Sequence, residues 1–241
     1  MQTRLPTGVH GLDEMLRGGF LPGSVILVRG APGTGKTCLS FQFLVTGAQR
    51  GEKGVFITFE EFPQTLYRDA NAFGHDLQAL EREDRLRIIF TSPRVFLESL
   101  QDPDSAIHQL LTAPDVRRAV LDSATHFNRL TYSRTELRQI YATVANSLRR
   151  EQITALLLSE EQRSEYHRAD RGGLSFLADG ILLLRYVEVE SAIQRALVVL
   201  KLRGSDHARE IRHYEITAQG IQVGPIFQGR EALLSGISHR T

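Results

Sequence analysis

Short apolar runs alternate with amphipathic segments through the first two thirds of the chain. Runs of a length suited to buried strands lie at residues 24–29, 54–59, 86–91, 119–122 and 154–159. Segments with apolar residues at helical spacing lie between them, at residues 36–49, 63–73, 103–111 and 134–150. Strands that alternate with helices are typical of an α/β protein, so we expect a mostly parallel central sheet flanked by helices.

The last of these helices has a clear start signal. Ser133 and Glu136 stand three residues apart, which is the spacing of a capping box. In that motif the serine side chain accepts a bond from the backbone N–H of the glutamate, and the glutamate side chain binds the backbone N–H of the serine. The pair therefore predicts a helix that begins here and continues to about Arg150.

The C-terminal third has a different pattern. Residues 180–188, 194–203, 212–217 and 220–224 resemble consecutive strands without helices between them. Such strands predict antiparallel hairpins added to one side of the parallel sheet. Because no Pro/Ser-rich linker divides the chain, we expect one domain over residues 1–228 and a flexible tail over residues 229–241.

Composition narrows the classes of protein without naming a function. Hydrophobic residues make up 41% of the 241 residues and charged residues 24%, as in ordinary globular proteins. The net charge of +1 gives no overall field that would attract nucleic acid or an anionic membrane. One cysteine, Cys38, leaves no internal disulfide, and no apolar run is long enough to cross a membrane. We therefore expect a cytoplasmic protein without a membrane partner.

A phosphate-binding loop stands between the first strand and the first helix. It reads Gly30-Ala31-Pro32-Gly33-Thr34-Gly35-Lys36-Thr37, which matches the P-loop (Walker A) pattern in its required context. The glycines allow successive backbone N–H groups to point at phosphate oxygens, and the helix dipole adds positive potential. We expect Lys36 to reach the β- and γ-phosphates of ATP and the Thr37 hydroxyl to bind Mg²⁺. Cys38, next in the helix, is interpreted as a small packing residue.

Acidic residues follow two other predicted strands. Asp122 ends the run Arg118-Ala119-Val120-Leu121, a pattern typical of the acid that holds Mg²⁺, with a turn-capping acid as the alternative. Glu60 and Glu61 follow the strand at residues 54–59, and one of them could orient or deprotonate the attacking water. We place Glu60 first and Glu61 in support. The alternative for this pair is a solvated acidic turn.

Taken together, the motifs resemble those of the KaiC/RecA superfamily of P-loop ATPases, which includes RadA-like proteins. The segment TGVHGLDEMLRGGF at residues 7–20 is similar to the sequence that precedes the P-loop in this superfamily. The P-loop, Thr58-Phe59-Glu60-Glu61 and Leu121-Asp122-Ser123 follow in the same order. Residues 178–181 and 199–207 resemble the C-terminal hairpins of KaiC-type domains. The similarity extends over residues 5–227.

The resemblance implies a RecA-like core that assembles into a ring, commonly a hexamer, with ATP between subunits. It implies Mg²⁺-dependent ATP binding and slow hydrolysis, with the paired glutamates activating water. It also implies that Lys201 and Arg203 reach the nucleotide of a neighbouring subunit, with a charged hairpin face as the alternative. His207 lies near them in the sequence and could touch the nucleotide, with an ordinary hairpin histidine as the alternative. KaiC carries two such domains and this chain carries one, so the resemblance is to a single-domain KaiC-like ATPase, and a clock function is not implied.

Three functional interpretations stay open at this point. The first is an ATPase ring that acts as a regulatory or signalling switch on a protein partner. The second is a DNA-binding recombination accessory ATPase, in which Tyr166 of the loop at residues 163–171 could stack on single-stranded nucleic acid; the near-neutral charge argues against it. The third is an ATP-sensing module, or an autokinase that phosphorylates Ser175. The segment around Ser175 resembles the region where KaiC phosphorylates a Ser/Thr pair, but Phe176 stands in the second position here.

Overall fold

A nine-stranded sheet forms the centre of the protein in this computed structural model, which describes residues 3–160, 173–227, 230–231 and 239–240. Six neighbouring strands run parallel, in the order β3 (Leu86–Phe90), β2 (Lys53–Thr58), β4 (Val116–Asp122), β5 (Thr154–Glu160), β1 (Val25–Gly30) and β6 (Gly180–Val189). The sheet continues antiparallel through β7 (Ala192–Leu202), β8 (Arg212–Thr217) and β9 (Gly220–Ile226). The predicted α/β fold with C-terminal antiparallel hairpins is therefore confirmed.

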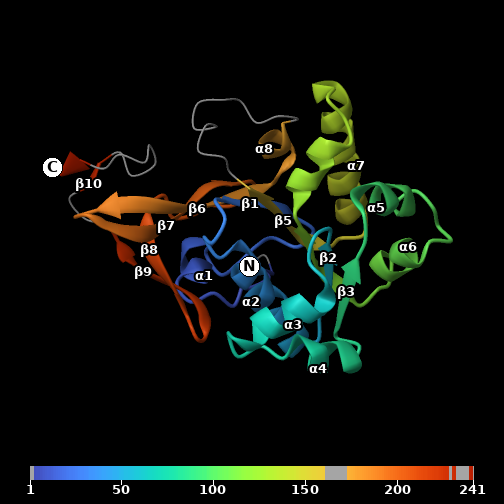
Figure 1. Cartoon of the computed structure of the whole chain (residues 1–241), viewed down its shortest axis with the longest axis horizontal. Helices are drawn as coiled ribbons and strands as arrows, with labels where there is room; N and C mark the ends of the chain where they lie inside the picture. Colours follow the sequence, from blue (N-terminus) through green and yellow to red (C-terminus); the bar gives the residue numbers. More distant parts are fainter. Residues whose placement is uncertain (1–2, 161–172, 228–229, 232–238, 241) are drawn as a thin grey trace.

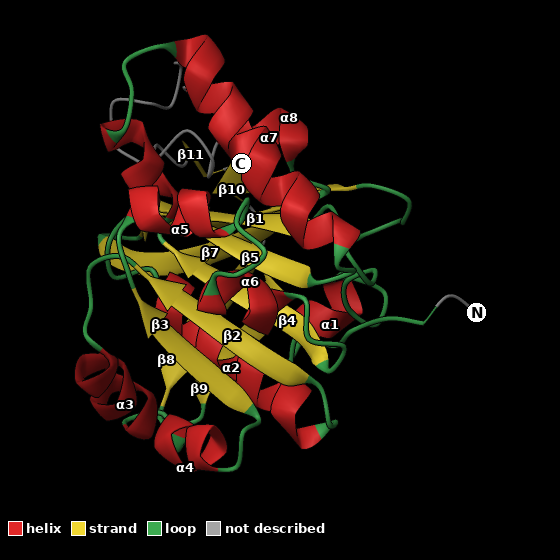
Figure 2. Cartoon of the chain, turned by 90° about the vertical axis from the view of Figure 1, so that its right-hand side faces the viewer, coloured by secondary structure: helices red, strands yellow, loops and turns green. Residues whose placement is uncertain are grey.

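Helices cover both faces of the parallel part (Figures 1 and 2). One face packs against α1 (Leu12–Met15), α2 (Lys36–Gln49), α3 (Pro63–Asn71) and α4 (Leu77–Arg82). The other face packs against α5 (Pro93–Ser99), α6 (Ala106–Leu111), α7 (Arg134–Arg150) and α8 (Leu174–Leu177). Alternation along β1 divides its side chains between the two cores, with Ile26 and Val28 in the first and Val25 and Leu27 in the second. Among the described residues, no helix is both long and apolar enough to span a bilayer.

Helices α4 and α5 are among the short helices that the sequence did not predict. Helix α4 begins after Asp76, whose side chain accepts a 2.8 Å hydrogen bond from Ala79 N. Helix α5 begins at Pro93 after Ser92, which caps it in the same way through Val95 N. Both are one to two turns long, and such short segments carry too few residues for a helical period to be recognised.

The capping box at the start of α7 is only half formed. The Ser133 hydroxyl accepts a 3.3 Å bond from Glu136 N, as predicted. The Glu136 carboxylate instead accepts a 2.5 Å bond from the Thr131 hydroxyl, and Ser133 N donates to that same hydroxyl at 3.0 Å. Thr131 therefore replaces the direct glutamate–backbone contact, and the helix still begins where the sequence indicates.

A buried arginine anchors the N-terminal segment to the core. Arg118 on β4 is fully buried, and its Nε donates a 2.6 Å bond to Glu52 Oε2. Its Nη1 donates 2.8 Å bonds to the carbonyls of Pro6 and Phe43, and the guanidinium lies over the Phe43 ring. One side chain thus joins β4, α2 and the residues that lead into the first strand.

The C-terminal strands are joined to the core through α2. The buried Gln42 side chain donates a 3.2 Å bond to Ile221 O and accepts a 2.7 Å bond from Ile221 N. Beyond β9, two short antiparallel strands, β10 (Arg230–Glu231) and β11 (His239–Arg240), are described. The division into a domain over residues 1–228 and a flexible tail stays a prediction.

Candidate functional site

The carboxyl ends of four parallel strands lie together, and we call this side of the sheet its nucleotide edge. The P-loop follows β1, Glu60 and Glu61 follow β2, and β4 and β5 end on Asp122 and Glu160. The register pairs Gly30 with Glu160, and Thr58 with Asp122. Parallel strands all present their carboxyl ends on the same side, which is the usual position of ligand sites in open α/β sheets. The loop and the predicted acids are therefore gathered at one site.

The P-loop packs against the C-terminal strands, which the sequence did not indicate. Gly33 has a φ of +77°, and a Cβ placed there would lie 2.7 Å from the Tyr186 hydroxyl oxygen. At Gly35, with a φ of +92°, a Cβ would lie 2.8 Å from Ile216 Cδ1. The Tyr214 hydroxyl donates a hydrogen bond to the carbonyl of Thr34. The loop therefore needs glycine at both positions for its left-handed conformation and for these close contacts.

Lys36 lies inside the curve of its own loop. Its Nζ donates hydrogen bonds of 2.9 and 3.1 Å to the carbonyls of Gly30 and Ala31. Burial lowers the pKa of Lys36, and the carboxylates of Glu160 and Asp122 oppose that change, with Glu160 the larger contribution. A buried cation within a glycine-rich loop at the start of a helix is an arrangement that fits an anionic phosphate group.

Thr37 and Asp122 form a pair of oxygen ligands. The Thr37 hydroxyl donates a 3.0 Å hydrogen bond to Asp122 Oδ2. Burial raises the pKa of Asp122 to about 6, the Thr37 bond opposes the shift, and the charges of Glu61 and Glu60 add to it. A hydroxyl and a carboxylate are ligands that Mg²⁺ prefers, and a cation bound there would favour the ionised carboxylate.

Glu60 contacts the segment that follows β4. Its Oε1 lies 3.1 Å from His126 Nε2 and 3.6 Å from Arg129 Nη2. Both partners belong to η1 (Ala124–Arg129), a 3₁₀ helix that begins two residues after Asp122. The Glu60 carboxylate therefore lies against the segment that directly follows the predicted magnesium ligand, Asp122.

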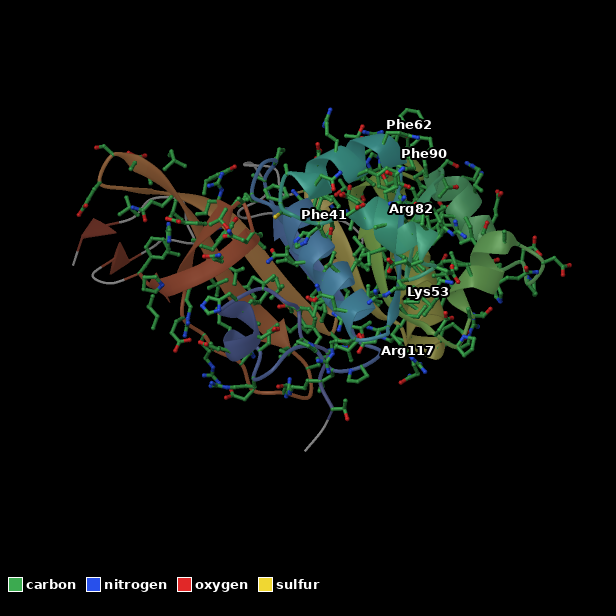
Figure 3. All side chains as sticks on the ribbon, turned by 90° about the horizontal axis from the view of Figure 1, so that it is seen from below. Phe41, Lys53, Phe62, Arg82, Phe90 and Arg117 are labelled. Carbon is green, nitrogen blue, oxygen red and sulfur yellow. The ribbon has the colours of Figure 1, made fainter. Side chains whose placement is uncertain are left out.

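Glu61 faces a different element. Its N–H donates a 3.1 Å bond to the Thr58 hydroxyl, which donates back to the Glu61 carbonyl. Burial raises the pKa of the Glu61 carboxyl, and the negative charges of Asp69 on α3 and of Glu60 raise it further. Phe62, the next residue, is largely exposed and lies against Phe90 with ring centroids 4.5 Å apart (Figure 3).

Lys201 and Arg203 lie at the opposite edge of the sheet from the P-loop of the same chain. The Lys201 Nζ donates bonds of 3.0 and 2.6 Å to the carbonyls of Ser175 and Ala178, beside the start of β6. Arg203 Nη2 donates a 2.9 Å bond to Phe176 O, and its backbone N–H binds the carbonyl of Asp179. Asp179 in turn binds Val25, at the start of β1, whereas the P-loop follows the end of that strand.

The remaining predicted residues also lie away from the P-loop, except Cys38. His207 precedes Ala208, whose N–H donates a 2.8 Å bond to Met15 O, so this segment packs on α1. Ser175 lies in α8, on the same edge as Lys201. Burial raises the pKa of Cys38 to about 11, which fits a packing thiol. The loop at residues 163–171, with Tyr166, lies outside the described residues.

Sequence reasoning missed several residues that shape this site. Burial has the largest effect on the pKa of Lys36, and Glu160 is the larger of the two charges that oppose it. Its position at the end of an apolar run was a usable signal once β5 is placed beside β1. Nothing local marked His126, Tyr186 or Tyr214, because their roles depend on which strands and turns become neighbours. The residues at this edge fit a nucleotide phosphate chain with a hard cation, held by the P-loop amides, Lys36, Thr37 and Asp122.

Comparisons with known proteins identify a family for this chain. A family profile described as "ATPase: KaiC" matches residues 5–228. Circadian clock oscillator proteins KaiC from Thermostichus vulcanus and from Prochlorococcus marinus strain MIT 9313 are 36% and 34% identical over 98% of the chain. The chain spans about half the length of these curated relatives, 45% and 47%.

A solved structure has the same architecture. The KaiC-like protein PH0186 from the hyperthermophilic archaeon Pyrococcus horikoshii OT3 superposes with a TM-score of 0.82 at 29% identity. The match covers 93% of this chain and all of that chain. With the profile match over nearly the whole sequence, these similarities show that the chain belongs to the KaiC ATPase family.

Proposed function

We propose that this protein binds ATP with Mg²⁺ and hydrolyses it slowly. The hydrogen bond between Thr37 and Asp122 is the observation that carries the proposal, because it presents a hydroxyl and a carboxylate together beside the phosphate loop. The P-loop amides and Lys36 would hold the phosphates. Mg²⁺, when bound, would neutralise charge on the phosphate oxygens and so assist the transfer of the γ-phosphoryl group to water.

Glu60 is the first candidate to activate the water, with Glu61 in support. Both follow β2, which is in register with β4, and both raise the pKa of Asp122 through their negative charge. That electrostatic influence supports a position close to the magnesium ligand for both carboxylates. A carboxylate near a bound metal and nucleotide can orient water or accept its proton.

Assembly into a ring, commonly a hexamer in proteins of this kind, would complete the site. Lys201 and Arg203 contact residues beside the start of β1, so they cannot serve the P-loop that follows the end of that strand. A head-to-tail neighbour could bring these cations to the nucleotide, where a cation in trans can raise the rate by ~10³–10⁵. A lone chain would lack them, so hydrolysis would depend on assembly.

Regulation of a protein partner is the biological role that we favour, since an assembly-dependent hydrolysis cycle can control a conformational change. Ser175 offers a second activity, autophosphorylation in trans, because it lies beside Lys201 at the edge that would meet the neighbour's nucleotide. An intact mass without added phosphate, after incubation with Mg²⁺-ATP, would exclude that activity. Salt-dependent binding to single-stranded DNA would favour the recombination-accessory role instead.

The direct test combines a turnover assay with light scattering after size exclusion, with and without Mg²⁺-ATP. The wild-type protein should release phosphate and assemble, Lys36→Ala should lose both nucleotide binding and turnover, and Glu60→Gln should bind without turnover. Loss of one such group typically lowers kcat by ~10²–10³. Equal turnover in the wild type and Lys36→Ala would overturn the proposal.

A further inference from the structure

The 3₁₀ helix η1 connects the ends of three strands at the nucleotide edge. It begins two residues after Asp122 at the end of β4. Its Thr125 hydroxyl accepts a 2.9 Å bond from Glu160 N at the end of β5, and its His126 contacts Glu60 after β2. A displacement of η1 would therefore shift three acidic residues together: Asp122, Glu160 and Glu60.

We propose that His126 is a positioning residue that holds the Glu60 carboxylate in place for activating water. This inference rests on the proposed function, in which Glu60 acts on the water. It adds a residue outside every motif that was recognised in the sequence. Its chemical content is an imidazole Nε2 that lies 3.1 Å from one carboxylate oxygen, a distance at which an N–H at Nε2 can donate a hydrogen bond to that oxygen.

The two partners differ in how firmly they are held. The Glu60 side chain is 58% exposed, so without a partner it would move among several rotamers. The His126 side chain is only 8% exposed, and its ring packs edge-on against Phe59, with centroids 6.0 Å apart. Phe59 also packs against Phe127 of η1. A fixed imidazole can therefore restrain a carboxylate that would otherwise be mobile, which is preorganisation.

The geometry leaves a carboxylate oxygen for catalysis. Both recorded contacts, from His126 and from Arg129, go to Oε1 of Glu60. The second oxygen can therefore face the water while the first is held. Arg129 is the weaker restraint, because it lies 3.6 Å away and its side chain is 74% exposed, where solvent screens the charge.

Steady-state kinetics of His126→Ala and His126→Gln test this role. We expect His126→Ala to lower kcat by about 10- to 100-fold, the usual effect of losing a hydrogen bond to a charged group, with KM for Mg²⁺-ATP unchanged. Glutamine retains an N–H donor, so His126→Gln should recover most of the loss. Arg129→Ala should lower kcat less than His126→Ala. The matched control is His108→Ala, which removes a histidine on α6 whose ring Nδ1 lies 3.2 Å from Leu100 O, and it should have no effect.

A measurement independent of turnover keeps the inference testable if His126→Ala unfolds. The imidazole ¹⁵N signals of His126 should shift in Glu60→Gln and stay in place in Glu61→Gln. Equal kcat in the wild type and His126→Ala, or no ¹⁵N shift in Glu60→Gln, would overturn the role of His126. A wild-type protein that releases no phosphate would instead overturn the proposed function, so the two failures can be distinguished.

Discussion

The hydroxyl of Thr37 donates a 3.0 Å hydrogen bond to Oδ2 of Asp122, across 85 positions of sequence. The bond joins the first turn of α2 to the end of β4, two strands away from β1 in the sheet order. Neither residue is a convincing metal ligand by itself. Together they place two hard oxygen ligands next to the phosphate loop, which is why several predictions concern this pair.

Removal of the Thr37 hydroxyl should lower the affinity for Mg²⁺-ATP more than the affinity for metal-free ATP. We expect Thr37→Ala to lose at least about tenfold in affinity for Mg²⁺-ATP, since one ligand and its bond to Asp122 disappear together. Thr37→Ser keeps the hydroxyl and is the matched control. Calorimetry with Mg²⁺-ATP, and with ATP in EDTA, measures both affinities; an equal loss under the two conditions would contradict a role in metal binding.

The raised pKa of Asp122 predicts a stability that depends on pH in the absence of metal and nucleotide. The folded pKa of about 6 lies above the ordinary value of 3.8, so the folded state binds the proton more tightly than the unfolded state does. The free energy of unfolding of the wild type, relative to Asp122→Asn, should therefore fall as pH rises from about 4 to about 6 and then stay level. Urea titrations at pH 4, 6 and 8 measure it. A difference between the two proteins that does not change with pH would contradict the shift.

The same titration should control metal binding. Mg²⁺ binds the ionised carboxylate, so protons compete with the metal below the Asp122 pKa of about 6. We expect the affinity for Mg²⁺-ATP to fall between pH 7 and pH 5 in the wild type, beyond any fall in the affinity for ATP in EDTA. In Asp122→Asn both affinities should show the same pH dependence, and a wild-type protein that behaved like this variant would refute the competition.

Two inactive variants should restore each other if the site is shared between subunits. Arg203→Ala lacks the cation expected from a neighbour, and Glu60→Gln lacks the expected base. A mixed ring would contain some sites with both groups intact, so phosphate release should reappear on mixing. Arg117→Ala, which removes an exposed arginine near the start of β4 (Figure 3), is the control and should be active alone. Normal assembly without recovery on mixing would rule out completion in trans.

The hydroxyl of Tyr214 should contribute to nucleotide binding indirectly, by holding the P-loop in place. It donates to the Thr34 carbonyl, and the side chain is buried. We expect Tyr214→Phe to cost about 1 kcal/mol of unfolding free energy and to weaken ATP binding several-fold, because the loop loses a restraint. Tyr132→Phe removes an exposed hydroxyl and serves as the comparison. Equal ATP affinities in these two variants would argue against a contribution of β8 to nucleotide binding through the Tyr214 hydroxyl.

Sequence patterns predicted the features that are local. The predicted helix at residues 36–49 has the bounds of α2, and β8 was predicted at its observed residues 212–217. The apolar runs predicted the strands, and the strands in turn placed the P-loop and the acidic residues at their carboxyl ends. The position of the candidate site could therefore be predicted from the sequence. The residues 180–188 were predicted as part of a hairpin, yet β6 is also the sixth parallel strand, because one edge pairs with β1 and the other with β7.

Contacts between distant segments could not be predicted in this way. Tyr186 closes on Gly33 because β6 pairs with β1, and His126 meets Glu60 because the turn after β4 lies beside the end of β2. A tyrosine in a strand or a histidine in a turn carries no mark of its partner. The family resemblance named Lys201 and Arg203, but only the topology shows that their own P-loop lies at the other edge.

Gln42 sets a limit on how far this protein can be shortened. Both polar groups of its amide, in a side chain from the helix that leads out of the phosphate loop, are matched by the backbone of Ile221. A truncation before β9 would leave that buried amide without hydrogen-bond partners. It would also remove the Ile221 side chain that packs near Gly35. We therefore expect a fragment that ends before β9 to lose stability around α2 and the phosphate loop, so a shortened protein should keep Ile221.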